Sequence, residues 1–360
     1  MVEVRVENLC KRFGSRYIFN NFSMRIENES FTTILGPPGA GKTTLLRLLA
    51  GVEIPDGGKI YFDGRDVTDI PAKDRNVAMV FQSFALHPTR KVFDNIASPL
   101  KIKNVPKEET RRRVKEVADM LGIGDLLDRY PRELSGGQQQ RVAIARAMVK
   151  KANLIFFDEP LTNLDYKIRE SMRSELKKIF TAQGGTIVYA TPDPTDALSM
   201  AKYVAVINQG KLEQYGPVDD VYNYPANTFV GYYFSFPPMN LLDGKVVREK
   251  GALVLNSHDL KVDLSDCKEG IKEGDELILG LRPSQLFKVD GDDVVKFEGE
   301  VIITEVIGSE TIIHVQYNGA RLAVHVPMIY RLLPGDKLTI GFRPCDAFIF
   351  RKADGSLIRR

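Results

Sequence analysis

A glycine-rich loop near the N-terminus constrains the fold more tightly than any other part of this sequence. The segment GPPGAGKT at 36–43 matches the pattern G-x-x-x-x-G-K-[ST] and lies between an apolar run at 31–35 and a helical run at 44–50. Glycine lets backbone N–H groups surround phosphate oxygens, and the positive end of the following helix favours the same anion. The pattern predicts an α/β domain that binds a nucleoside triphosphate. A turn that only joins two elements is the alternative.

Two side chains of this loop have expected partners in the nucleotide complex. Lys42 is expected to reach the β- and γ-phosphates, and the hydroxyl of Thr43 is expected to bind Mg²⁺. The predicted nucleotide-binding residues are Gly36, Pro37, Pro38, Gly39, Ala40, Gly41, Lys42, Thr43 and Thr44.

A second apolar run ends in two adjacent carboxylates. The run at 154–157 is typical of a buried parallel strand, and Asp158 and Glu159 follow it directly. Phosphoryl transfer depends mainly on positioning and on charge neutralisation. We therefore expect Asp158 to bind Mg²⁺ and Glu159 to act as the general base toward water. Two solvated acids at a strand end are the alternative.

The segment LSGGQ at 134–138, which precedes a predicted helix at 139–150, narrows the class further. With these three motifs the chain resembles the ABC ATPases. The resemblance implies that Ser135, Gly136, Gly137 and Gln138 bind the γ-phosphate of a nucleotide held by a second cassette, at the N-terminus of a helix. Two cassettes would then meet head to tail around the nucleotides.

The same resemblance implies roles for three residues outside these motifs. Gln82 matches the glutamine that contacts Mg²⁺ and water and relays to the membrane partner. Phe13 matches the aromatic residue that stacks on adenine, with Tyr17 as an alternative. Asp165 matches the acid that contacts the phosphate loop of the opposite cassette.

One expected element is missing. The family places a histidine that contacts the γ-phosphate after the strand expected at 186–191, and this chain has Pro192 there. Proline has no side-chain donor and no N–H, and loss of one preorganised donor typically costs about 10²- to 10³-fold in rate. Either hydrolysis tolerates Pro192 because Glu159 remains, or the chain lends its LSGGQ segment to a paralogous partner while its own site turns over slowly.

Composition predicts an ordinary globular protein. A net charge of +3 gives no argument for a nucleic-acid partner, and 43% hydrophobic and 27% charged residues fit a folded chain of 360 residues. The three cysteines, Cys10, Cys267 and Cys345, have no metal or disulfide spacing, which fits a reducing cytoplasm. No apolar run approaches 18 residues, so separate subunits are expected to supply any channel.

The expected architecture is an α/β cassette at 1–236, with antiparallel β and helical (about 87–151) subdomains, followed by a β-rich domain at 237–360. Alternation at 2–26 and the segment 57–64 predict antiparallel strands and a hairpin. Two similar pieces, GLRP at 280–283 and GFRP at 341–344, suggest repeat-like halves of a small barrel. This tail resembles the oligonucleotide/oligosaccharide-fold domain of carbohydrate-importer ATPases, where it supports the dimer or binds regulators.

The resemblance as a whole implies an ATP- and Mg²⁺-dependent subunit that powers import of a sugar, polyol or related polar solute from the cytoplasmic face of the cell membrane. Its implied partners are two transmembrane permease subunits, a second ATPase cassette (homodimer or paralogous heterodimer) and, indirectly, an extracytoplasmic solute-binding protein. The segments at 163–166, 189–191 and 237–240 look most like a branch linked with glycerol or glycerol phosphate. An exporter cassette and a non-hydrolysing docking subunit are the alternatives.

Overall fold

The computed structural model describes residues 2–162, 166–267, 270–287 and 293–359. The chain forms two compact units, 1–218 and 219–360. Each unit has its own hydrophobic core. The boundary between 236 and 237 stays a prediction. Among the described residues, no helix combines the length and the apolar character needed to cross a bilayer.

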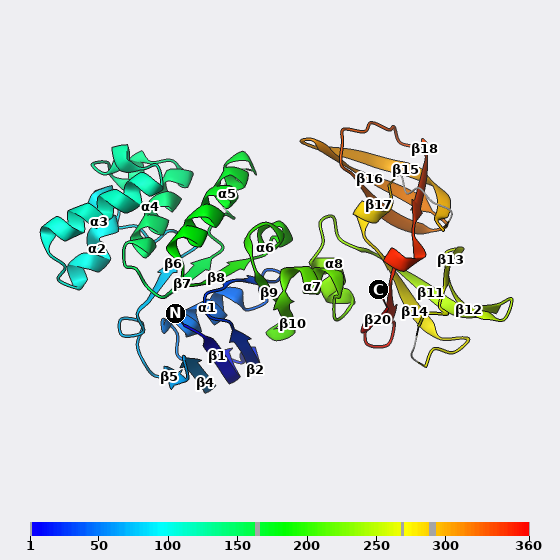
Figure 1. Cartoon of the computed structure of the whole chain (residues 1–360), viewed down its shortest axis with the longest axis horizontal. Coiled ribbons are helices and arrows are strands. Elements are labelled where there is room, and N and C mark those ends of the chain that lie inside the picture. The colour runs from blue at the N-terminus through cyan, green and yellow to red at the C-terminus, as the bar shows by residue number, and fades with distance from the viewer. Residues whose placement is uncertain (1, 163–165, 268–269, 288–292, 360) are drawn as a thin grey trace. The chain divides into compact units, whose positions relative to one another are not determined.

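A six-stranded sheet forms the centre of the first unit (Figure 1), with the order β10-β9-β3-β8-β7-β6. All neighbouring strands are parallel except β9 and β10. Parallel neighbours place their carboxyl ends at one edge of a sheet, which is where ligands bind in such folds. The strands are β3 (Phe31–Leu35), β6 (Val77–Val80), β7 (Leu154–Asp158), β8 (Thr186–Thr191), β9 (Tyr203–Asn208) and β10 (Lys211–Pro217).

The sheet separates two cores, and β7 shows how side chains are divided between them. Leu154 and Phe156 belong to the core shared with α1 (Lys42–Ala50), whereas Ile155 and Phe157 belong to the core of the helical side. Successive side chains of a strand point to opposite faces. A strand buried on both faces is therefore continuously apolar, as the sequence predicted.

A second sheet of the first unit is antiparallel, with the order β2-β1-β4-β5. Its strands confirm the alternation predicted at 2–26 and the hairpin predicted at 57–64. They are β1 (Val4–Phe13), β2 (Arg16–Ile26), β4 (Gly57–Phe62) and β5 (Arg65–Asp66).

Helices form the remainder of this unit, and two of them begin earlier than the sequence predicted. Helix α4 begins at Gly136 because Ser135 caps it, and our predicted start at Gln139 is wrong. Helix α1 begins at Lys42 rather than at Thr44, directly after the left-handed Gly41. The others are α2 (Val92–Ile102), α3 (Lys107–Met120), α4 (Gly136–Met148), α5 (Tyr166–Gln183) and α6 (Pro194–Met200), with short 3₁₀ turns at Gly124–Leu126 and Pro131–Glu133.

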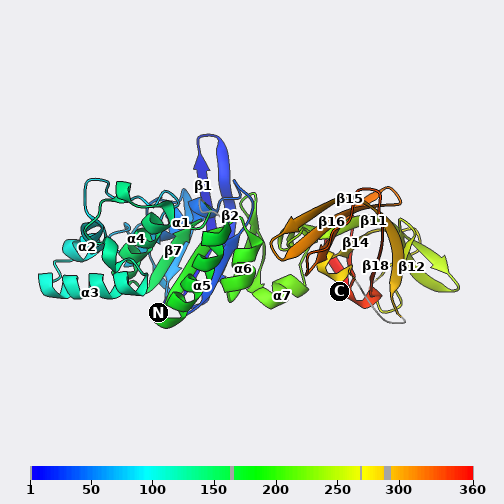
Figure 2. The ribbon, with the colours of Figure 1, turned by 90° about the horizontal axis from the view of Figure 1, so that it is seen from above.

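The second unit consists mainly of strands in both views of the chain (Figures 1 and 2). Its two antiparallel sheets have the orders β13-β12-β11-β14-β19-β20 and β17-β16-β15-β18. The two similar pieces occupy equivalent places, since β14 and β18 each lead into a 3₁₀ turn at Pro283–Gln285 and Pro344–Asp346. The elements are α7 (Val218–Asn223), α8 (Thr228–Tyr233), β11 (Asn240–Glu249), β12 (Ala252–Ser257), β13 (Leu260–Asp263), β14 (Glu276–Leu281), β15 (Val295–Ile307), β16 (Glu310–Tyr317), β17 (Ala320–Val326), β18 (Lys337–Phe342), β19 (Phe348–Arg351) and β20 (Leu357–Arg359).

Candidate functional site

The phosphate loop runs from the end of β3 to the start of α1. A Cβ on Gly36 would lie 2.3 Å from the carbonyl oxygen of Ile207, and Gly41 has a φ of 106° with the ring of Phe19 beside it. Larger residues would displace the loop at both positions. The Lys42 ammonium donates to the carbonyls of Gly36 (2.8 Å) and Pro37 (3.1 Å). The loop thus curls around the cation that it would offer to a phosphate.

Asp158 and Thr43 meet at the edge of the sheet. Asp158 has the same parity along β7 as Leu154 and Phe156, so its side chain points toward α1. The Thr43 hydroxyl donates to Asp158 Oδ1 at 2.8 Å. Burial raises the pKa of the Asp158 carboxyl, and the charge of Glu159 raises it further, while the Thr43 hydrogen bond opposes both. Burial and the neighbouring charge make the ionised carboxylate unfavourable here, and a divalent cation would compensate for both.

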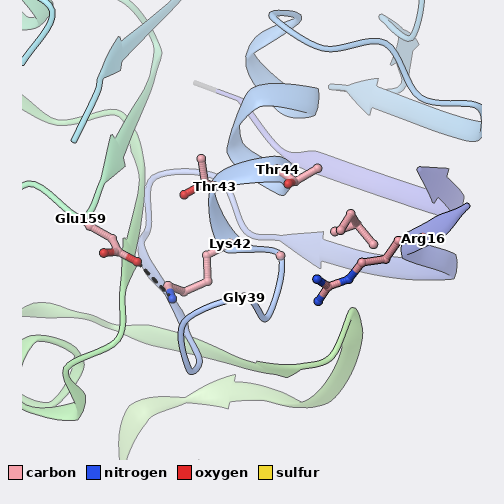
Figure 3. Close-up of a pocket in the computed structure, with 8 residues that line it drawn as sticks. Arg16, Gly39, Lys42, Thr43, Thr44 and Glu159 are labelled. Atoms are coloured by element: carbon pink, nitrogen blue, oxygen red, sulfur yellow. Dashed lines mark ion pairs between the residues drawn. The ribbon is translucent and has the colours of Figure 1, made fainter. Parts of the chain in front are cut away.

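Glu159 turns back over the phosphate loop. Its φ is 46°, in the left-handed region that non-glycine residues seldom adopt. Glu159 Oε1 lies 3.1 Å from Lys42 Nζ (Figure 3), and Gln82 Nε2 donates to Oε2 at 3.4 Å. Sparsely populated backbone conformations of this kind cluster at functional sites. The arrangement places the predicted base against both the lysine predicted to bind phosphate and the glutamine predicted to contact water.

The cavity at this loop also includes two residues that the sequence analysis missed. Arg16 and Ile18 of β2 line it together with Gly39, Lys42 and Glu159. In Figure 3 Arg16 lies on the other side of the loop from Glu159. Arg16 could have been identified from the sequence, because it is a basic residue three positions after Phe13, the predicted adenine-stacking residue. The remaining lining residues are Gly41, Thr43 and Thr44.

The predicted adenine platform lies outside that lining. Phe13 pairs with Arg16 across the β1–β2 hairpin and is 49% exposed, and Lys11 Nζ lies 5.1 Å from the centroid of its ring. Tyr17 is 56% exposed on the same hairpin. Both rings are accessible to a base, so the choice between them stays a prediction.

The LSGGQ segment forms the start of α4. Ser135 Oγ accepts from the N–H of Gln138 (3.3 Å), and the Gln138 side chain accepts from the N–H of Ser135 (3.0 Å), which is a capping box. Accepting this bond leaves the serine hydroxyl able to donate. A Cβ on Gly136 would meet no described atom within 4 Å, so the internal packing of the chain does not require glycine there.

Pro192 follows β8 directly and adjoins the phosphate loop, because the N–H of Gly36 donates to the carbonyl of Thr191 (3.4 Å). An ion-pair network fixes the segment after Pro192. Arg173 of α5 contacts Asp193 Oδ2 and Asp196 Oδ1, each at 2.6 Å, and Thr191 Oγ1 donates to Asp196. Asp165, the last predicted site residue, lies outside the described residues.

Comparison with known families and proteins identifies relatives of the whole chain. The ABC transporter family model matches 19–162, the MalK OB fold domain matches 237–286, and the TOBE domain matches 271–350. The trehalose/maltose import ATP-binding protein MalK of Thermococcus litoralis is 42% identical, and the match covers 99% of this chain and 100% of that protein. The oligosaccharides import ATP-binding protein MsmX of Bacillus subtilis is 38% identical, with 95% of each chain covered.

Two further matches bear on the solute and on the fold. The sn-glycerol-3-phosphate import ATP-binding protein UgpC 1 of Rhizobium johnstonii is 35% identical, with 99% of this chain and 95% of that protein covered. These relatives are named for different solutes, so they do not select glycerol phosphate. A solved dimer of MJ0796, titled a bacterial ABC transporter cassette, is 31% identical with a TM-score of 0.55, covering 59% of this chain and 98% of its own.

The fold and the site therefore define an ABC-type ATPase cassette, followed by OB and TOBE domains. The chain belongs to the ATP-binding subunits of ABC transporters of the MalK importer type. This confirms the fold class and the family predicted from the sequence. Membership implies binding of ATP, and assembly of a cassette dimer with membrane permease subunits.

Proposed function

We propose that this chain hydrolyses ATP to power import of a sugar, oligosaccharide or related polar solute through separate permease subunits at the cytoplasmic face of the cell membrane. The observation that carries the proposal is the contact of Lys42 and Thr43 with the two carboxylates at the end of β7. The names of the full-length relatives, which include trehalose/maltose and oligosaccharide importers, support the solute class. Substrate would reach the permease from an extracytoplasmic binding protein.

The chemistry that we propose follows from charge and position. The phosphate loop binds the ATP phosphates through its N–H groups and through Lys42, which must exchange Glu159 for the β- and γ-phosphates. Glu159, released from that ion pair, is then free to accept a proton from the attacking water. Gln82, which contacts Glu159, orients that water.

The same site fits Mg²⁺, with Thr43, Asp158 and Gln82 as its expected protein contacts. The ion would neutralise charge on the β- and γ-phosphates during transfer. Mg²⁺ keeps several water or phosphate ligands, so one buried carboxylate and one hydroxyl suffice.

We propose that the start of α4 binds the γ-phosphate held by a second cassette, through Ser135, Gly136, Gly137 and Gln138. Support comes from the open space around Gly136, since a glycine without an internal reason is suited to a close external approach. Asp165 would contact the phosphate loop of the opposite cassette, and Phe13 or Tyr17 would stack on adenine.

A second candidate arises from Pro192. The chain would serve in a mixed pair, in which its LSGGQ segment completes the site of a paralogue while its own site turns over slowly. Steady-state ATPase activity of the purified chain, with Glu159→Gln as the blank, separates the two. Turnover that depends on Glu159 supports a working homodimer, whereas ATP binding without turnover favours the mixed pair. Absence of ATP binding would overturn both.

A further inference from the structure

The loop that contains Gln82 has an unusual backbone. It connects β6 to α2 over residues 81–91, and we refer to these residues as the Gln82 loop. Phe84 and Ala85 have φ values of 61° and 48°, so two consecutive non-glycine residues adopt the left-handed conformation. Each such residue costs roughly 1 kcal/mol or more, and the conformation persists where surrounding contacts determine it. Some contact must therefore hold this part of the loop.

Arg146 of α4 provides that contact. Its Nη1 donates to the carbonyl of Ala85 at 2.7 Å, and its Nη2 donates to the carbonyl of Phe84 at 2.8 Å. A guanidinium is a rigid fork, so two bonds fix the direction of both carbonyls at once. Burial lowers the pKa of Arg146, which is consistent with a cation whose acceptors here are neutral carbonyls. Arg146 thus fixes the strained turn two residues after Gln82.

The other end of the loop is also held from the helical side. The fully buried Asn95 of α2 accepts from the N–H of His87 and donates to the carbonyls of His87, Arg90 and Lys91. Helices α2 and α4 pack against each other. The Gln82 loop is therefore fixed to the helical side at two places, while Gln82 itself contacts Glu159, which directly follows β7.

Helix α4 connects this anchor to the LSGGQ segment. Gly136 and Arg146 are ten residues apart in one uninterrupted helix, which corresponds to about 15 Å along its axis. A helix packed on several sides moves as a rigid element. A displacement of Gln82, transmitted through Arg146, would therefore reach the residues that bind the opposite nucleotide.

We propose that Arg146 is a positioning residue that couples the Gln82 loop to the LSGGQ segment, so that nucleotide at the phosphate loop reorients the start of α4. This inference rests on the proposed function. Without Arg146, MgATP still binds to the phosphate loop and Asn95 still holds the far end of the Gln82 loop, but the direct link from Phe84 and Ala85 to α4 is lost.

The chain offers a matched control just after the end of the same helix. Lys150 donates to the carbonyl of Val77 at 2.5 Å, and burial lowers its pKa as it does that of Arg146. Its acceptor lies at the start of β6 and not in the Gln82 loop. Lys150→Met removes a partly buried cation–carbonyl contact just after α4 without touching the coupling. Arg146→Lys retains the charge and can reach one carbonyl.

Amide hydrogen exchange of the full-length chain tests the proposal, with Glu159→Gln present in every variant to retain MgATP. In the otherwise unaltered chain, we expect MgATP to slow exchange at 36–44 and at 135–139. Arg146→Met should keep the first effect within about twofold and reduce the second by about tenfold. Lys150→Met should keep both effects, and Arg146→Lys should restore part of the second. Thermal melts measure the stability of each variant.

Four outcomes would overturn the inference. Arg146→Met could retain the slowed exchange at 135–139, or Lys150→Met could lose it equally, which would reduce Arg146 to a packing role. If Arg146→Met does not fold, the comparison of Arg146→Lys with Lys150→Met decides, and equal responses contradict the coupling. If MgATP leaves 36–44 unchanged even without an Arg146 substitution, the proposed function fails, and this inference fails with it.

Discussion

The ends of two neighbouring parallel strands, β7 and β8, contribute to the site in opposite ways. At the end of β7, Asp158 and Glu159 contact the phosphate loop directly. At the end of β8, the polar side chains of Thr191, Asp193 and Asp196 are engaged with one another or with Arg173 of α5. Pro192, which lies between Thr191 and Asp193, has no side-chain donor. The β8 loop keeps a fixed scaffold without the predicted donor to a γ-phosphate, and the end of β7 keeps the groups that we propose to react.

Among the substitutions at these two strand ends, removal of the predicted base should have the largest effect, and the effect should be on turnover. Glu159→Gln keeps the size of the side chain but cannot accept the proton of water, and general-base catalysis contributes roughly 10²- to 10⁴-fold. We expect turnover to fall by that factor while ATP stays bound. Phosphate release and retention of labelled ATP after rapid desalting measure the two effects. Glu170→Gln, which lies on an exposed part of α5, is the control. Turnover at the parent rate would show that the base is another group.

The scaffold after β8 should respond in stability. Arg173→Met leaves the buried Asp196 without its cationic partner, whereas Asp193 keeps Arg169 at 3.6 Å. Breaking a buried pair on one side costs roughly 3–5 kcal/mol. Although burial alone would lower the pKa of Arg173, the two carboxylates raise it overall, which supports a charged partner. Urea unfolding followed by a probe in the cassette measures the loss. Lys177→Met, on the exposed surface of the same helix, is the control. A loss below about 1 kcal/mol would contradict a rigid scaffold.

Restoring the missing donor tests whether that scaffold still has the required geometry. Because Arg173 and Asp193 fix the loop, Pro192→His should present an imidazole at the position where the family has one. We expect turnover to rise by roughly tenfold or more in a homodimer. Pro192→Ala separates the donor from the release of backbone constraint. If both variants match the parent, the loop has moved and Pro192 is more than a missing donor.

Local patterns predicted the parts of the site that depend on neighbouring residues. The apolar run of β7 and the phosphate loop needed no distant contact, and their strands were confirmed. The start of α4 at Gly136 was missed because two glycines disfavour a helix, although Ser135 and Gln138 have the spacing of a capping box. The ion pair of Lys42 with Glu159 joins residues more than a hundred positions apart and depends on the left-handed backbone of Glu159. A periodic pattern of apolar residues cannot predict such a contact.

That ion pair makes the smallest and most specific prediction. In the structure Glu159 forms an ion pair with the ammonium of Lys42, which is expected to bind the phosphates. The carboxylate also places a negative charge beside the expected position of the phosphates. Both side chains are largely buried, at 3% and 15% exposure, so water screens the pair only partly. Glu159→Gln removes the competitor and the repulsion together, and we expect ATP to bind about fivefold more tightly, corresponding to roughly 1 kcal/mol. Equilibrium binding of a fluorescent ATP analogue in EDTA measures this without turnover.

Gln82→Glu, which places a new carboxylate next to Glu159, should weaken binding instead. Equal affinities in all three proteins would mean that Lys42 reaches the phosphates without leaving Glu159, and the two ends of β7 and β8 would then differ only in the group at Pro192.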